Sequence, residues 1–252
     1  MKVNEIFVSI QGEGRLAGVV SVFVRLAGCD LHCRWCDTPY ARRPDQGRDM
    51  SVAEIIEQVD SHDCAHVVVT GGEPLIAPQL PALLGGLKAR DRHVTLETAA
   101  RQYRPIVCDL VSISPKLTHA QLDEESHADT DEESKPNVGA EPHVNAGAEP
   151  RTRPGVAIET DRLNIKAIRN FIEEHDYQLK FVIRDEDDLT EVEDILNQLP
   201  AVPKDRVLLM PLARTQSEHR RRGPLVAELC RAQGYRYCPR LQVELWDNRR
   251  GC

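Results

Sequence analysis

The chain has 252 residues, of which 41% are hydrophobic, so it can bury the core of one domain or at most two. Its formal net charge is −8, and most of the acidic excess lies in residues 118–155. The rest of the chain is nearly balanced in charge, which argues against a general nucleic-acid-binding protein. No apolar run approaches the roughly 18 residues of a transmembrane helix, and the first residues contain no apolar signal-peptide segment. We therefore expect a cytoplasmic protein without a membrane role.

Apolar, β-branched runs alternate with helix-like stretches along the chain. The runs predicted to be strands cover residues 19–26, 66–70, 93–96, 107–113, 178–183, 207–210 and 241–246. One predicted helix starts after Ser51, where Glu54 completes a capping box, and the others cover residues 80–89, 165–174 (after Asn164 as a cap), 189–199 and 224–233. This alternation implies βαβ units and a parallel sheet, either open and doubly wound or curved into a partial (β/α) barrel. In both arrangements ligands bind at the carboxyl ends of the strands.

Residues 118–155 depart from this pattern. They contain nine acidic and three basic residues, no aromatic residue, and few large aliphatic ones. Such a segment cannot bury enough apolar area to offset the entropy of ordering, so we predict a disordered acidic insertion within a single domain. A solvated insertion without a role is favoured, and a partner-binding segment remains the alternative.

The sharpest signal is a group of three cysteines, Cys29, Cys33 and Cys36, in a predicted loop after a strand. In a chain expected to keep its thiols reduced, such a group indicates a metal centre or catalysis. A structural zinc site usually has four ligands, and the nearest further candidate, His32, directly precedes Cys33 and is expected to point away. Three thiolates suit a [4Fe–4S] cluster with one iron left open. The other cysteines stand singly and are expected to be ordinary apolar residues: Cys64, Cys108, Cys230, Cys238 and Cys252.

The C-x3-C-x2-C spacing, with Trp35 before the last cysteine, resembles the radical S-adenosylmethionine (SAM) superfamily. A second segment, Gly71-Gly72-Glu73-Pro74 after the strand 66–70, resembles the motif that contacts the methionyl amine of SAM in that superfamily. Glycines there let the backbone approach a ligand closely. The resemblance implies a partial (β/α) barrel of about six parallel strands, the radical SAM core, with a [4Fe–4S] cluster and SAM as cofactors.

Finer details resemble one family, 7-carboxy-7-deazaguanine synthase. Four stretches carry this resemblance, namely residues 4–14 with their Gln-Gly-Glu-Gly sequence, 23–29, 36–38 and 112–116, and residues 239–251 are similar to the family's C-terminus. The resemblance covers about residues 1–116 and 160–252. It implies a lyase that converts 6-carboxy-5,6,7,8-tetrahydropterin into 7-carboxy-7-deazaguanine with loss of ammonia, in queuosine and 7-deazapurine biosynthesis.

The same resemblance assigns roles on the substrate side. Ile10, Gln11 and Gly12 would line the pterin, and Glu13 would accept hydrogen bonds from its amino-pyrimidine edge. Arg25, inside an apolar strand, needs an anionic or acceptor partner, which is either the substrate carboxylate or a structural ion pair. The further expected substrate contacts are Thr70 and the terminal carboxylate at Cys252.

On the cofactor side, Thr38 is expected to be a ligand of Mg²⁺, which prefers oxygen donors and binds substrate oxygens directly. The expected SAM contacts are Trp35, Asp37, Gly72, Glu73, Ser114 and Lys116. The sequence departs from the family at Gln242, where the family often has His, and at Ala99-Ala100 in place of Asn-Gly. No general base is assigned.

In the implied reaction, reductive cleavage of SAM gives a 5′-deoxyadenosyl radical that takes hydrogen from C6 of the pterin. Flavodoxin or ferredoxin would donate the electron, and the chain would form a homodimer. Two alternatives remain open: another radical SAM enzyme, such as a glycyl-radical activase, and a zinc-binding interaction module. Small-molecule turnover without a partner protein would distinguish the first, and metal analysis the second.

Overall fold

The computed structural model describes residues 1–120, 162–247 and 249–251. Nine strands in these residues form one sheet, in the order β3-β1-β2-β4-β5-β6-β7-β8-β9. The strands are β1 (Lys2–Ile10), β2 (Val20–Leu26), β3 (Arg48–Asp49), β4 (His66–Gly71), β5 (His93–Thr98), β6 (Leu110–Ile113), β7 (Tyr177–Ile183), β8 (Val207–Pro211) and β9 (Arg236–Tyr237).

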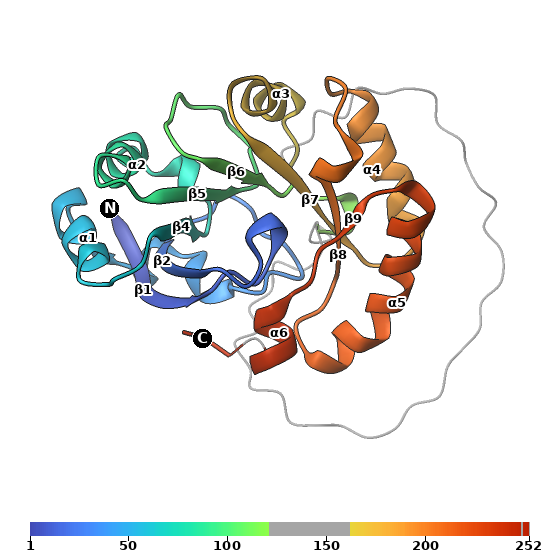
Figure 1. Ribbon diagram of the computed structural model, residues 1–252, viewed down its shortest axis with the longest axis horizontal. Helices are drawn as coiled ribbons and strands as arrows, with labels where there is room; N and C mark the ends of the chain where they lie inside the picture. Colours follow the sequence, from blue (N-terminus) through green and yellow to red (C-terminus); the bar gives the residue numbers. More distant parts are fainter. Residues whose placement is uncertain (121–161, 248, 252) are drawn as a thin grey trace.

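The sheet is parallel from β2 to β9, and β1 and β3 join it antiparallel at one edge. Six of the parallel strands have four residues or more, and β9 adds a short seventh. The sheet curves into an arc with most helices on its outer side (Figure 1). This confirms the predicted partial (β/α) barrel and decides against the open doubly wound sheet.

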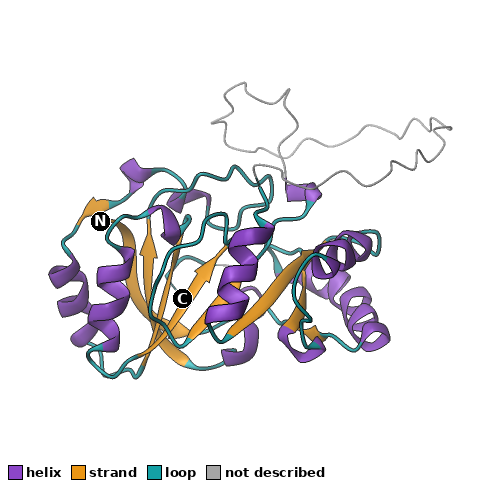
Figure 2. Ribbon diagram, turned by 90° about the horizontal axis from the view of Figure 1, so that it is seen from above, coloured by secondary structure: helices purple, strands orange, loops and turns teal. Residues whose placement is uncertain are grey.

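The described residues also form six α-helices and six short 3₁₀ helices. The α-helices are α1 (Val52–Asp60), α2 (Leu80–Lys88), α3 (Ile165–Glu174), α4 (Asp188–Asn197), α5 (Gln216–Gln233) and α6 (Leu241–Trp246). The 3₁₀ helices are η1 (Gly14–Leu16), η2 (Pro39–Ala41), η3 (Pro44–Gln46), η4 (Pro74–Ile76), η5 (Thr118–Ala120) and η6 (Lys204–Arg206). The view in Figure 2 shows helices packed along the flanks of the sheet.

Two predicted helix starts are confirmed by their caps. The Ser51 hydroxyl accepts a hydrogen bond from the Glu54 amide, and the Glu54 carboxylate accepts one from the Ser51 amide, which is the capping box expected for α1. At α3, the Asn164 side chain accepts from the amide of Ala167. Both caps supply acceptors for amides that have no partner within the helix.

The core lies between the convex face of the sheet and the helices that cover it. Strand β7 shows the pattern most clearly, because all seven of its residues are buried. Phe181 of this strand and Phe171 of α3 belong to the same core cluster, and both are fully buried. Runs of buried residues are typical of parallel strands covered on both faces. The one charged residue in this strand, Lys180, is therefore conspicuous.

The structure corrects the sequence prediction at the C-terminal end. Residues 241–246 form the helix α6 rather than a strand, and only Val243 of this helix is buried. Helix α5 begins at Gln216 instead of residue 224, because Thr215 caps it and Pro224 lies inside it. Proline usually marks the first turn of a helix, so the sequence favoured a start that is eight residues too late. Strand β1 was not predicted, and β6 begins at Leu110 rather than at residue 107.

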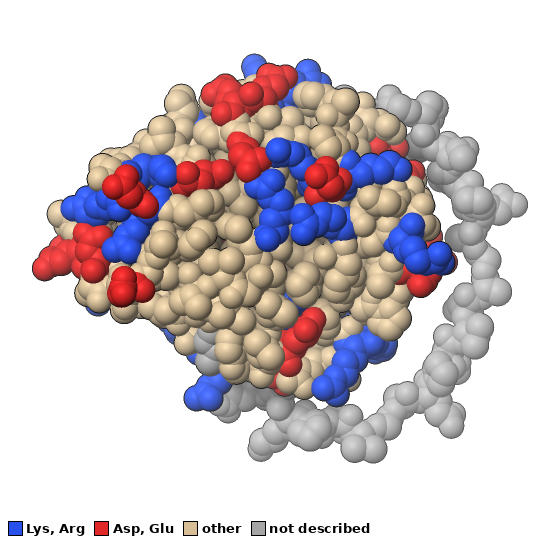
Figure 3. All heavy atoms as spheres, in the orientation of Figure 1, with Lys and Arg blue, Asp and Glu red and all other residues tan. Residues whose placement is uncertain are grey.

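Most of the predicted acidic insertion, residues 118–155, lies outside the described residues. Its first three residues are described, and they form η5 against α4 and β7. None of the helices in the described part of the chain is long and apolar enough to cross a membrane. On the face shown in Figure 3, basic and acidic side chains lie beside one another, and neither sign covers the surface.

Candidate active site

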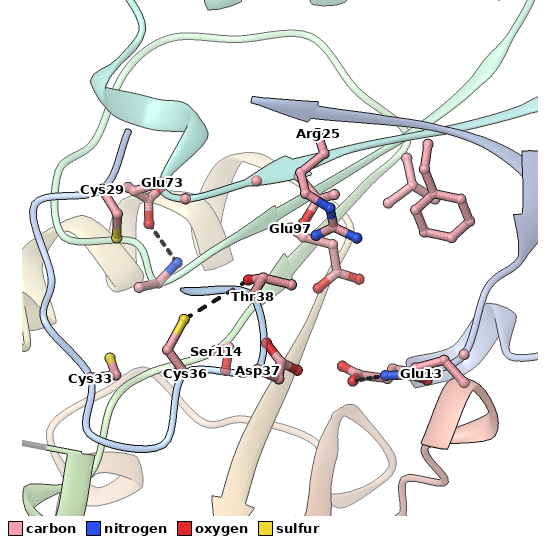
Figure 4. A pocket seen from close by; sticks show the side chains of 18 of the residues that line it. Glu13, Arg25, Cys29, Cys33, Cys36, Asp37, Thr38, Glu73, Glu97 and Ser114 are labelled. Atoms are coloured by element: carbon pink, nitrogen blue, oxygen red, sulfur yellow. Dashed lines mark hydrogen bonds between the residues drawn. The ribbon is translucent and has the colours of Figure 1, made fainter. Parts of the chain in front are cut away.

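A single pocket at the carboxyl ends of the parallel strands collects nearly all of the predicted site residues. It is lined from β1, β2, β4, β5, β7 and β8, from the loops after β2 and β6, and from the C-terminal segment. Figure 4 shows the three predicted metal-binding cysteines on one side of this pocket and Glu13 on the other. The pocket therefore has a cysteine side and a polar side, which are built differently.

The cysteine side is formed by the loop from Gly28 to Thr38. The amide of Gly28 donates to the carbonyl of Ala41 at 2.9 Å, and the amide of Cys29 donates to the carbonyl of Arg42 at 2.9 Å. These bonds close the loop at its base. A tight turn, with the Cys36 amide donating to the Cys33 carbonyl at 3.2 Å, brings the last two cysteines together.

The donor set of this loop fits an iron–sulfur cluster. Cys29, Cys33 and Cys36 are free, partly buried and lie on the same pocket, whereas the exposed His32 does not line it. Burial raises the pKa of the Cys29 thiol to about 11 and also raises the pKa of Cys33. Metal ligation would displace these protons. Among the described residues, no three His, Cys, Asp or Glu side chains gather tightly enough to hold a single metal ion.

The two glycines after β4 let two backbone segments pack against each other. The Gly72 amide donates to the Leu26 carbonyl at 3.0 Å. A Cβ atom at Gly72 would lie 2.0 Å from the Gly28 carbonyl oxygen, and one at Gly71, where φ is +141°, would lie 2.2 Å from the Leu26 carbonyl oxygen. The close approach made here is to the end of β2 and the start of the cysteine loop, whereas the approach expected from sequence was to a ligand, which stays a prediction.

Glu73 holds the ends of β4 and β5 together. Its carboxylate accepts from the Thr98 hydroxyl at 2.6 Å, the Ala99 amide at 2.8 Å and the Leu75 amide at 3.1 Å. Burial raises the pKa of this carboxyl against the lowering effect of these donors. The residue is 2% exposed, so it shapes the pocket wall with most of its hydrogen-bonding capacity already used.

The remaining expected SAM contacts all line the pocket: Trp35, Asp37, Gly72, Ser114 and Lys116. The Lys116 ammonium donates to the Ser114 hydroxyl at 2.9 Å and lies 5.6 Å from the centre of the Trp35 ring. This part of the wall thus presents one cation close to the cysteine loop.

The polar side is a buried chain of charged groups that the sequence prediction missed in large part. Lys180 donates to Glu13 at 2.9 Å and to Glu97 at 2.6 Å. The Gln11 side chain donates to the other oxygen of Glu97 at 3.2 Å. Lys180 is only 2% exposed, and its two carboxylate partners hold its pKa above the usual value against the cost of burial.

Arg240 and Gln242 complete this chain from the C-terminal segment. Arg240 donates to Glu13 at 3.2 Å and also pairs with Asp37, while Gln242 donates to Glu13 at 2.7 Å. Although burial alone would raise the pKa of Glu13, Lys180 and Arg240 hold it well below its usual range. The predicted departure at Gln242 therefore has a defined role here, as a donor to Glu13. The sequence did contain a signal for this network of charged groups, because Lys180 lies within an otherwise uncharged, largely apolar strand.

Arg25 makes the structural ion pair that was the alternative to a substrate contact. Its Nε donates to Glu5 at 2.7 Å. In the described residues no hydrogen bond engages its two Nη groups, and Figure 4 shows the guanidinium directed into the pocket near Thr38 and Glu97. The two expectations for Arg25 are thus compatible, because Nε and the Nη groups have different partners available.

Thr38 occupies the cap position of η2, as a turn residue would, but its side chain makes no capping hydrogen bond. Its hydroxyl lies 3.9 Å from the Cys36 sulfur and lines the pocket. Thr70, Ile10 and Gly12 also line it. Cys252 lies outside the described residues, although the preceding Gly251 reaches the pocket.

The sequence is similar to those of known proteins over nearly its whole length. A model of the radical SAM superfamily matches residues 24–123. A 7-carboxy-7-deazaguanine synthase from Halobacterium salinarum is 37% identical over 98% of this chain and 91% of its own. One from Rhodopirellula baltica is 35% identical over 99% of this chain and 88% of its own.

The fold has a relative among solved structures as well. The crystal structure of QueE from Escherichia coli matches with a TM-score of 0.65 and 21% identity, over 94% of this chain and 92% of that one. At this identity the match shows the fold, while the two curated relatives show the family. The chain belongs to the 7-carboxy-7-deazaguanine synthase family of the radical SAM superfamily.

Proposed function

We propose that this protein is a radical SAM lyase that converts 6-carboxy-5,6,7,8-tetrahydropterin into 7-carboxy-7-deazaguanine with loss of ammonia. The observation that carries the proposal is family membership over nearly the whole chain, together with three free thiols and a carboxylate-rich wall on one pocket. When bound, the [4Fe–4S] cluster and SAM supply the one-electron chemistry that removes hydrogen from C6 of the pterin. The chain's own residues bind and orient the substrate.

The polar side of the pocket has acceptor capacity left for a donor-rich substrate edge. A carboxylate has about four acceptor positions. Glu13 accepts from three donors and Glu97 from two, so the two groups together retain about three positions. The amino-pyrimidine edge of a pterin presents N–H donors, and hydrogen bonds to carboxylates are the strong ones. This supports Glu13 and Glu97 as the groups that hold that edge.

A substrate carboxylate would find its partner in Arg25. The free Nη groups of this guanidinium offer planar, two-pronged hydrogen bonding, which matches a carboxylate. Glu5 holds Nε and thereby fixes the direction of the fork. Arg25 would then set the end of the pocket at which the carboxylated carbon of the pterin lies, which is the orientation the reaction requires.

We further propose Mg²⁺ at Thr38. Its hydroxyl is not used in capping, and it faces the same space as Arg25 (Figure 4). One hydroxyl is a weak ligand, so substrate oxygens and water would supply the rest, and metal and substrate binding would be coupled. Thr38→Ala should therefore reduce stimulation by Mg²⁺ several-fold while leaving the KM for SAM unchanged. Unaltered Mg²⁺ dependence in this variant would rule out the ligand role.

The proposal includes partners that rest on family resemblance alone. A small acidic redox protein such as flavodoxin or ferredoxin would deliver the electron, and the working unit would be a cytoplasmic homodimer. Sedimentation at micromolar concentration tests the dimer directly. A monomeric, fully active protein would contradict it.

Turnover by the purified protein tests the central proposal. The holoenzyme, reconstituted without oxygen, is given SAM, dithionite, Mg²⁺ and the carboxy-tetrahydropterin, and the product is identified by mass. We expect 7-carboxy-7-deazaguanine and about four irons and four sulfides per chain. SAM cleavage without that product, even with substrate in excess, would show that the protein acts on something else.

A further inference from the structure

A short 3₁₀ helix braces the cysteine loop from outside the pocket. Helix η5 follows Lys116 after one residue and contacts the loop at two points. The backbone amide of Arg34 donates to the Ala120 carbonyl at 3.0 Å. The indole Nε1 of Trp35 donates to Nδ1 of His119 at 2.8 Å. Both bonds fall on residues between Cys33 and Cys36.

The His119 ring is fixed as an acceptor. Because Nδ1 accepts from the indole, the ring proton lies on Nε2, which faces the Val182 carbonyl oxygen of β7 at 3.1 Å and Asp188 of α4 at 3.4 Å. The His119 side chain is 3% exposed. Its neighbours on two different elements leave the ring one orientation, so the bond to Trp35 has a fixed direction.

The brace itself is anchored to the body of the protein. Both the amide and the hydroxyl of Thr118 donate to Glu191 of α4, at 2.8 and 3.0 Å. Arg162 donates to the Thr118 hydroxyl at 2.8 Å and pairs with Glu191 at 2.9 Å. Helix η5 therefore connects the cysteine loop to α4 and β7, elements that the loop does not otherwise reach through hydrogen bonds in the described residues.

Trp35 is the residue of the cysteine loop that both bonds to η5 and lines the pocket. Its indole lines the pocket, packs 5.5 Å from the His119 ring and lies close to the Lys116 ammonium. Trp35 also packs against a small buried cluster that includes Val182 of β7 and Met210 of β8. The bond from Nε1 to His119 adds a directional polar contact, which favours one rotamer of the indole.

We propose that His119 is a positioning residue of the SAM site, which holds the Trp35 indole against the pocket and ties the cysteine loop to α4 and β7. The inference rests on the proposed function and on the expected contact between Trp35 and SAM. What it adds is a role for His119, which would act through its bond to Trp35 without touching SAM or substrate.

Fluorescence of the protein without cluster or SAM tests the His119–Trp35 bond directly. The chain has two tryptophans, so Trp246→Phe leaves Trp35 as the sole reporter. In this background, His119→Phe should increase acrylamide quenching of Trp35 about twofold and red-shift its emission, because the indole loses its acceptor. His119→Asn, which keeps an acceptor near the same place, should restore most of the original signal. His93→Asn, at the amino end of β5 and outside the pocket lining, controls for the loss of a partly buried histidine.

Steady-state kinetics of the holoenzyme then test the consequence for SAM. His119→Phe should raise the KM for SAM about fivefold, the equivalent of one hydrogen bond, with a smaller effect on the KM for the pterin. In a Trp35→Phe background the same substitution should have no further effect on the KM for SAM.

Each outcome decides a separate point. Unchanged quenching in His119→Phe would overturn the positioning role, and so would an effect on the KM for SAM that persists in the Trp35→Phe background. A normal KM for SAM in Trp35→Phe would show that Trp35 does not contribute to SAM binding, and this would also overturn the inference. If the wild-type holoenzyme makes no product, the proposed function fails, and the fluorescence result still judges the His119–Trp35 bond.

Discussion

The two sides of the pocket are built in opposite ways. The cysteine side is one short loop, with three partly buried thiols that have few protein partners. The polar side is assembled from the loop after β1, from β5 and β7, and from the segment before α6, and its charged groups are bonded to one another. The first side is prepared for a group that arrives from outside. The second is a preformed network, whose cost of burial is offset by internal ion pairs.

The largest expected effect is on the cysteine side, from loss of any one thiol. Replacing Cys29, Cys33 or Cys36 with Ala should remove bound iron and abolish SAM cleavage, because the cluster depends on all three. Cys64→Ala is the matched control, since the Cys64 thiol is buried and donates to the Val20 carbonyl at 3.1 Å, away from the pocket. Iron content and 5′-deoxyadenosine formation measure the outcome. Equal iron loss in the control would mean that the ligands are assigned wrongly.

On the polar side, removal of Lys180 should affect folding before it affects catalysis. Lys180→Met leaves Glu13 and Glu97 buried without their shared cation, which should lower the free energy of unfolding by about 3–5 kcal/mol. Denaturant unfolding at neutral pH measures this. Glu97→Gln in the same background should recover part of the loss, and a wild-type-like Lys180→Met would show that the ion pairs contribute nothing.

Lys180→Met should also change how the free energy of unfolding depends on pH. The pKa of Glu13 is lowered, so its contribution is present above the unfolded value of about 4.3 and is lost only as the pH falls through the lower folded value. The pKa of Lys180 is raised, so its contribution is present below about 10.4 and is lost as the pH rises through the higher folded value. Wild-type stability should therefore change little through these two groups between about pH 5 and pH 10. In Lys180→Met the largest cause of the lowered Glu13 pKa is gone, and only Arg240 and Gln242 remain to oppose burial. The stability that Glu13 contributes above about pH 4.3 should therefore shrink.

A smaller effect is expected where the network touches the Gln-Gly-Glu-Gly sequence. A Cβ atom at Gly12 would lie 1.8 Å from Oε1 of Gln242, so Gly12→Ala should push that side chain off Glu13. We expect a destabilisation of about 1–3 kcal/mol. The KM for the pterin should also rise. Because Gln242 is a flexible side chain, Gly12→Ala combined with Gln242→Ala should be less destabilised than Gly12→Ala alone. Additive losses in the double variant would contradict the overlap.

The difference between the two sides also explains what could be predicted from sequence. The cysteine side is contiguous, so the spacing of Cys29, Cys33 and Cys36 was enough to define it. The polar side joins residues 13, 97, 180 and 240, which only the fold brings together. The reasoning that singled out Arg25, a charge inside an apolar strand, applies equally to Lys180. The helix at residues 241–246 was missed because its short, mostly apolar sequence fits a strand as well.

The smallest expected effect comes from shortening the acidic segment while keeping η5, which bonds to the cysteine loop. Replacing residues 123–158 with a short Gly-Ser linker should change the KM for SAM less than twofold, since loop length alone costs little. The described residues on either side of the segment are in contact, because Arg162 bonds to the Thr118 hydroxyl. Deleting residues 118–155 instead removes η5, and with it both bonds to the cysteine loop. This second deletion should raise the KM for SAM at least as much as His119→Phe does. If the shorter replacement is equally harmful, residues 123–158 contribute to the cysteine side themselves.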